Sequence, residues 1–78
     1  MIALNSVEKR VLDELHKYDF LSVASLHAAA SSSLSDFHSG MIRLVALGAI
    51  EGCRDTEDDK RVFRVTEKGR DFYAICYE

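Results

Sequence analysis

The fold is decided by a stretch in the middle of the chain, which reads Leu44-Val45-Ala46-Leu47-Gly48-Ala49-Ile50-Glu51. Up to Gly48 the apolar residues recur at helical spacing, and beyond it the spacing changes to that of a strand. Glycine tolerates the left-handed backbone that ends many helices, so Gly48 is expected to end this one. Ile50 then turns into the core. The stretch therefore predicts a helix that runs directly into the first strand of a β-hairpin.

The residues after this stretch predict the rest of the hairpin and a final helix. Residues 50–54 and 61–66 are short strand candidates, and residues 55–60 form a polar, charged turn between them. Alternation turns Phe63 and Val65 inward, and Val62 and Arg64 outward. Thr66 is suited to cap a helix over about 67–77. The inner side of this helix is expected to carry Phe72, Ile75 and Cys76.

Three helices are predicted before the hairpin, over about 5–18, 22–30 and 35–47. Their expected N-caps are Asn5 or Ser6 (with Glu8 as the partner in a capping box), Ser22 and Ser35. Helical spacing places charged residues of the first helix, Glu8 among them, on its solvent side. The expected buried residues are Leu4, Val7, Val11, Leu15 and Tyr18 in the first helix, Val23, Leu26 and Ala29 or Ala30 in the second, and Phe37, Met41, Leu44 and Leu47 in the third.

Composition limits the class of protein. A chain of 78 residues with 47% apolar content is expected to fold as a single domain over 1–78. No apolar run approaches the roughly 20 residues that span a bilayer, and the first residues lack the features of a signal peptide. We therefore expect a cytoplasmic protein. The formal net charge of −3 argues against bulk attraction to nucleic acid or to anionic lipid.

The predicted order of elements is typical of a helix-turn-helix followed by a wing. Residues 44–51 resemble the LxxLGxIE junction at which a recognition helix meets the first wing strand. The segment Phe63-Arg64-Val65-Thr66-Glu67-Lys68-Gly69-Arg70 resembles the one that closes the wing and opens the last helix. Both are found in winged helix-turn-helix regulators of the broad MarR- and PadR-like type. The resemblance implies a mostly helical α+β fold with three helices, a two-stranded β-wing and a C-terminal helix. Its helix-turn-helix would span about 22–47, its wing about 50–66 and its last helix about 67–77.

The resemblance also implies a function, namely regulation of transcription by a dimer that binds double-stranded DNA. The third helix would lie in the major groove, and its DNA-facing positions fall on Ser35, Asp36, His38, Ser39, Gly40, Ile42 and Arg43. The residues expected to contact DNA are Ser33, Ser35, His38, Ser39, Arg43, Arg54, Lys60 and Arg61. This chain departs from the usual pattern, because its third helix has one arginine and its wing turn has four acidic residues.

Those departures support an alternative, a winged-helix module that binds a protein partner. Ile42 and Val45 fall on sides of the third helix that usually carry charge, and Tyr73 and Tyr77 form an i,i+4 pair on the last helix. These four residues are the expected interface positions. In this interpretation the acidic wing imitates nucleic acid.

Other classes of function find no support in the sequence. No residues have the spacing of a catalytic nucleophile and its base, and no glycine-rich phosphate loop is present. His16, His27 and His38 are eleven residues apart, which is not the spacing of metal ligands, and Cys53 and Cys76 form no metal-binding pair. We therefore expect no enzymatic activity, no metal and no cofactor.

Overall fold

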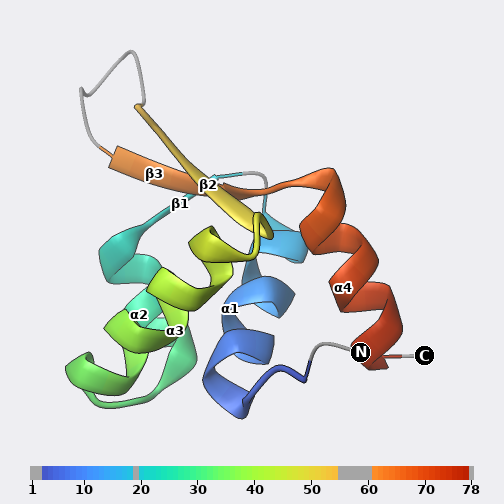
Figure 1. The fold of residues 1–78 in the computed structure, drawn as a ribbon. Coiled ribbons are helices and arrows are strands. Elements are labelled where there is room, and N and C mark those ends of the chain that lie inside the picture. The colour runs from blue at the N-terminus through green and yellow to red at the C-terminus, as the bar shows by residue number, and fades with distance from the viewer. Residues whose placement is uncertain (1–2, 19, 55–60, 78) are drawn as a thin grey trace.

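The computed structural model describes residues 3–18, 20–54 and 61–77, and the side chains of these residues up to residue 75. Seven elements follow one another along these described residues. They are α1 (Ser6–Lys17), β1 (Leu21–Ser22), α2 (Val23–Ala30), α3 (Leu34–Ala46), β2 (Ile50–Arg54), β3 (Arg61–Val65) and α4 (Glu67–Tyr77). Helix α1 contacts the other three helices. The sheet lies across one end of the helices, and α4 packs on the side of α1 away from α2 (Figure 1).

The wing sheet has three strands in the order β1-β3-β2, all antiparallel. The predicted wing hairpin is confirmed as β2 and β3, and β1 adds a third strand that was not predicted, because Leu21 pairs with Phe63 and Ser22 with Val62. These two residues are extended just before α2 begins. In a two-stranded hairpin this edge of β3 would be free. Strand β1 pairs with it and so provides hydrogen-bond partners for backbone groups that would otherwise have none in the sheet.

The core forms where α1, α2, α3 and the base of the wing meet. Its fully buried side chains include Leu12 and Leu15 of α1, Leu26 of α2, Phe37 and Leu44 of α3, and Ile50 of β2. The predicted buried face of α3 is confirmed at Phe37, Met41 and Leu44, and Leu47 packs against the same cluster. Val65 is buried and Phe63 is half-buried, as the strand alternation predicts.

Three helix ends fold as the local sequence predicts. Gly48 has a left-handed backbone (φ 74°) and ends the helical segment before β2. The hydroxyl of Thr66 accepts a hydrogen bond from the backbone N–H of Gly69 at 3.0 Å, which caps α4. Asn5 and Glu8 form the predicted capping box at the start of α1.

Several predicted details of the first three helices were wrong. Val23 of α2, which was expected to be buried, is 37% exposed. Helix α3 is capped by Ser33, whose hydroxyl accepts from the N–H of Asp36 at 3.2 Å, so Ser35 lies inside the first turn. Glu8 is fully buried rather than on the solvent side of α1, and Tyr18 lies beyond the helix and is 54% exposed. The burial errors have a common cause, because the buried face of a helix is set by the neighbouring elements that pack on it.

The predicted inner face of α4 is confirmed at Phe72 and was wrong at Ile75. Phe72 and Tyr73 pack against the core, whereas Ile75 is 62% exposed. The ring of Tyr73 stacks on His16 with centroids 4.3 Å apart, and its hydroxyl donates to Asp13 at 2.9 Å. Tyr73 is therefore half-buried and bonded to α1. The side chains of Cys76 and Tyr77 lie outside the described part of the chain.

Candidate nucleic-acid interface

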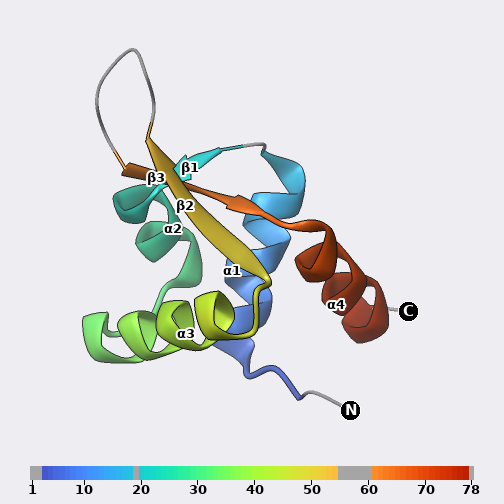
Figure 2. The same cartoon turned by 45° about the horizontal axis from the view of Figure 1, so that its top comes forward.

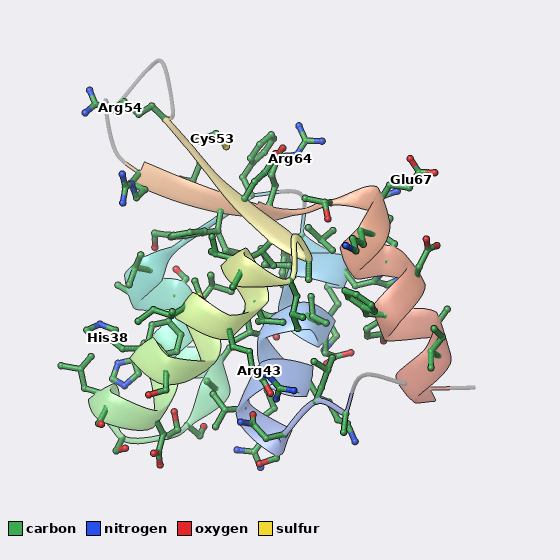
Figure 3. All side chains as sticks on the ribbon, viewed as in Figure 1. His38, Arg43, Cys53, Arg54, Arg64 and Glu67 are labelled. Carbon is green, nitrogen blue, oxygen red and sulfur yellow. The ribbon has the colours of Figure 1, made fainter. Side chains whose placement is uncertain are left out.

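Helix α3 turns one long stripe of its surface to the solvent. The stripe consists of Ser35, Ser39, Ile42 and Ala46, which follow one another at i, i+4, i+7 and i+11 and are all exposed. His38 and Val45 flank the stripe on the side of the wing, and Asp36 and Arg43 flank it on the side of α1. Figure 3 shows His38 and Arg43 on different sides of the helix. We refer to the four residues as the α3 stripe.

Gly40 lies off this stripe and is buried against α1, so its expected position on the DNA side was wrong. A Cβ atom at Gly40 would lie 3.3 Å from Cγ1 of Val7 and 3.5 Å from Cγ of Glu8. The missing side chain lets α1 and α3 approach closely. This contact packs one side of α3 on α1, next to which α3 runs in Figure 2, and leaves the opposite side of α3 exposed to solvent.

Arg43 is engaged with α1 rather than directed away from the protein. Its Nη1 lies 2.8 Å from Oε1 of Glu8, and its Nη2 donates to the carbonyl oxygen of Ala3 at 2.8 Å. The same carboxylate oxygen accepts from the N–H of Asn5 at 2.8 Å. Oε2 of Glu8 is buried and has no hydrogen-bond partner within the described chain. Arg43 therefore supplies the neutralising charge for a buried carboxylate, a role that the sequence did not indicate.

The wing brings two of the predicted cationic residues together. Arg54 and Arg61 lie directly opposite each other at the outer end of the β2–β3 pair (Figure 3 labels Arg54). Strand alternation places this pair on the sheet face that also carries Ile50 and Phe63, toward the helices. Lys60, the third cation expected in the wing, lies outside the described residues.

A further arginine of the wing was not among the predicted site residues. Arg64 lies opposite Glu51, and its Nε is 3.0 Å from Oε1 of that residue. Both side chains are half-exposed. An ion pair of this kind contributes little stability, so Arg64 can exchange a carboxylate for another anion. The alternation of β3 was the available signal, since it predicted an outward Arg64.

An apolar hollow of about 270 Å³ joins the α3 stripe to the wing. It is lined by Val23, Phe37, His38, Met41, Ile42 and Phe63. Ile42 is 70% exposed and Val45 is 48% exposed. The structure therefore places both predicted interface residues of α3 on the surface, next to the predicted DNA contacts.

The predicted serine contacts are all on or beside α3. Ser33, Ser35 and Ser39 are exposed. Ser33 uses one lone pair of its hydroxyl to cap the helix, and its proton stays available to a phosphate. Ser35 and Ser39 belong to the α3 stripe itself.

Among residues 3–18, 20–54 and 61–75, no cluster of three His, Cys, Asp or Glu side chains could hold a metal ion. Within the described part of the chain, no helix has the length and apolar character needed to cross a membrane. A second hollow of about 220 Å³ lies between α1, β3 and α4, lined by Leu15, His16, Phe20, Arg64, Val65 and Arg70.

The similarity of this chain to known proteins is found in its structure and not in its sequence. The sequence matches no protein-family model and no curated protein. The structure matches a MarR-family transcriptional regulator from Silicibacter pomeroyi with a TM-score of 0.82 and 23% identity, over 95% of this chain and 50% of the other. It matches BpsR of Bordetella bronchiseptica, whose DNA binding is regulated by 6-hydroxynicotinic acid, with a TM-score of 0.83 and 20% identity over 92% of this chain and 52% of BpsR.

A third similar structure includes nucleic acid. It is a mutant of MarR from E. coli in complex with operator DNA, with a TM-score of 0.80, 19% identity, and coverage of 95% of this chain and 54% of that one. The chain thus spans about half the length of the solved structures that it matches. At these identities the likeness establishes the fold, and it agrees with the resemblance seen at residues 44–51 and 63–70. The chain has the winged helix-turn-helix fold of the MarR-family transcriptional regulators.

Proposed function

We propose that this chain is the DNA-binding part of a transcriptional regulator, with α3 in the major groove and the wing on the phosphate backbone. The observation that carries the proposal is the exposure of the α3 stripe beside the Arg54–Arg61 pair, within a fold that E. coli MarR presents to operator DNA. An α-helix that has one side exposed to solvent fits into the major groove of DNA.

The net charge of −3 does not oppose this proposal once its origin is considered. Residues 55–60 contain four acidic residues and one lysine, so this short segment alone accounts for a charge of −3. The rest of the chain has nine basic and nine acidic residues. The strands of the wing contribute Arg54, Arg61 and Arg64 against Glu51. Of these residues, Arg54 and Arg61 lie on the sheet face toward the helices, whereas Arg64 and Glu51 pair on the other face.

The contacts follow from the geometry of each group. Base edges would be approached by Ser35, His38, Ser39 and Ile42. Phosphates would be bound by Ser33, Arg54, Lys60 and Arg61. Arg43 is left out of both sets, because its guanidinium is bonded to Glu8 and Ala3.

Titration of the protein into a labelled duplex at several salt concentrations tests the proposal. Binding should weaken as salt rises, because each phosphate contact releases counterions. Replacing Arg61 with alanine should lower the slope of log K against log salt by about one and weaken binding to all sequences about equally. The matched control is Arg70→Ala on α4, which should keep the slope. Absence of salt-dependent binding by the native chain would overturn the proposal.

A second candidate function is the binding of a protein partner, and the exposed apolar side chains of Ile42 and Val45 favour it. The double variant Ile42→Lys with Val45→Lys separates the two functions. It adds two cations to the outer side of α3, so non-specific DNA binding should strengthen. Capture of a protein partner through an apolar surface should be abolished, and unchanged capture would contradict this second candidate.

We also propose that the protein acts as a homodimer in the cytoplasm. Two copies place two α3 helices on successive turns of one duplex, which suits the two-fold symmetry of many operators. The measurement is the mass in solution by sedimentation, with and without a duplex. A mass of one chain under both conditions would contradict the dimer.

A further inference from the structure

We propose that α3 selects its DNA by the C5-methyl group of thymine, which Ile42 contacts in the major groove. The inference rests on the proposed DNA binding and names the base chemistry that the α3 stripe reads. The α3 stripe contains none of the residue types that usually read base edges by paired hydrogen bonds. Bidentate recognition of guanine needs Arg or Lys, and bidentate recognition of adenine needs Asn or Gln.

Helix α3 offers none of these groups on its outer side. Over its length, Leu34–Ala46, the only residue of these four types is Arg43. Both of its terminal nitrogens are bonded to groups at the N-terminal end of the chain, to Glu8 and to Ala3, at 2.8 Å. Asp36, which could accept from cytosine, flanks the stripe on the side of α1. The usual hydrogen-bond code is therefore absent from the centre of the helix.

The chemistry that remains on the α3 stripe is small hydroxyls and methyl groups. The hydroxyls of Ser35 and Ser39 can both donate and accept, so they distinguish bases poorly. Ile42 and Ala46 present hydrocarbon, and Ile42 keeps 70% of its surface in water. The thymine methyl is the one apolar group on the floor of the major groove of unmodified DNA, and small apolar side chains are suited to contact it.

The surroundings of Ile42 support the same conclusion. The isoleucine borders the apolar hollow, so hydrocarbon continues from the stripe to Phe63 of the wing. His38 is the polar residue among those that line this hollow. The Arg54–Arg61 pair supplies charge complementary to phosphate at the end of the same sheet face. Binding to a groove rich in thymine would cover the exposed isoleucine and keep the cations next to the backbone.

Two duplex polymers that differ only in the methyl group provide the test. The native chain is titrated with poly(dA-dT) and with poly(dA-dU) at one salt concentration. The thymine polymer should bind about fourfold more tightly for each methyl group that becomes buried. Ile42→Ala removes most of the hydrocarbon at this position and should lower the ratio of the two affinities. The matched control removes an exposed isoleucine from α4, and Ile75→Ala should keep the native ratio.

The outcomes separate this inference from the function on which it rests. Salt-dependent binding to both polymers with equal affinity keeps DNA binding and overturns thymine selection. An unchanged ratio in Ile42→Ala also overturns it, because the preference then comes from the shape of the duplex and not from Ile42. Failure to bind either polymer overturns both proposals and favours a protein partner for the α3 stripe.

Discussion

The two sides of α3 differ in a way that reverses the usual use of residue types. Ile42 and Arg43 are neighbours in the sequence, yet the isoleucine is 70% exposed and the arginine is bonded to a fully buried glutamate. On the buried side Phe37 and Leu44 are inaccessible to solvent. The difference teaches that contact with α1 determines which side of α3 is buried, and that the α3 stripe on the opposite side remains accessible to a partner. Each substitution below tests that division, by its effect on stability.

The largest effect is expected for Phe37→Ala. The ring is fully buried, so its removal costs transfer free energy and leaves a cavity. The free energy of unfolding should fall by about 3–5 kcal/mol, measured by urea denaturation. Leu34→Ala is the control on the same helix, because Leu34 is 56% exposed. A small loss for Phe37→Ala would contradict the assignment of the two sides.

A smaller loss is expected for Arg43→Ala, because it leaves the carboxylate of Glu8 buried without its cation. Breaking a buried ion pair typically costs 3–5 kcal/mol, and since Arg43 is 46% exposed we expect about 2–3 kcal/mol. Adding Glu8→Gln should restore part of the stability, because the double variant buries no charge. If Arg43→Ala unfolds no more easily than the native chain, the ion pair does not hold α1 to α3.

The start of α3 should show a still smaller effect. Ser33→Ala removes the N-cap hydrogen bond to Asp36 and should cost about 1 kcal/mol. Ser35→Ala lies inside the first turn and should change the free energy of unfolding by less than about 0.5 kcal/mol. Comparison of the two variants by thermal unfolding checks which serine is the cap. Equal losses would contradict the assignment to Ser33.

The smallest change in stability is expected for Ile42→Ala. The side chain is mostly in water, and alanine favours helix more than isoleucine does, so the free energy of unfolding should stay within about 0.5 kcal/mol of the native value. A larger loss would show that Ile42 is needed for folding rather than for a partner. An unchanged stability of Ile42→Ala would show that a change in its DNA affinity comes from the lost side chain and not from unfolding.

Much of the fold could be predicted because its signals are local. Gly48 marks the end of the α3 segment through its own backbone conformation, and Thr66 caps α4 through a contact three residues away. The buried residues Phe37, Met41 and Leu44 recur at helical spacing. Each of these signals depends on residues within one helical turn, so a single sequence carries it.

The errors arose where local signals compete or where a distant residue decides. Ser33 and Ser35 are both good caps, but the backbone of Ser33 is extended and Ser35 already lies within the helix. Tyr73 turns inward because its hydroxyl reaches Asp13, sixty residues away in the chain. Strand β1 is too short to be recognised without β3 as its partner.

The candidate site divides in the same manner. The sequence by itself determined that a helix with few cations precedes a wing with arginines, because residue types and helical spacing are written in the chain. Only the tertiary structure decided that Arg43 is bonded to Glu8, thirty-five residues away, and that Ile42 lies bare beside an apolar hollow. The physical reason is that a buried carboxylate demands a cation from whichever segment packs on it, and this pairing exists only once α1 and α3 are in contact.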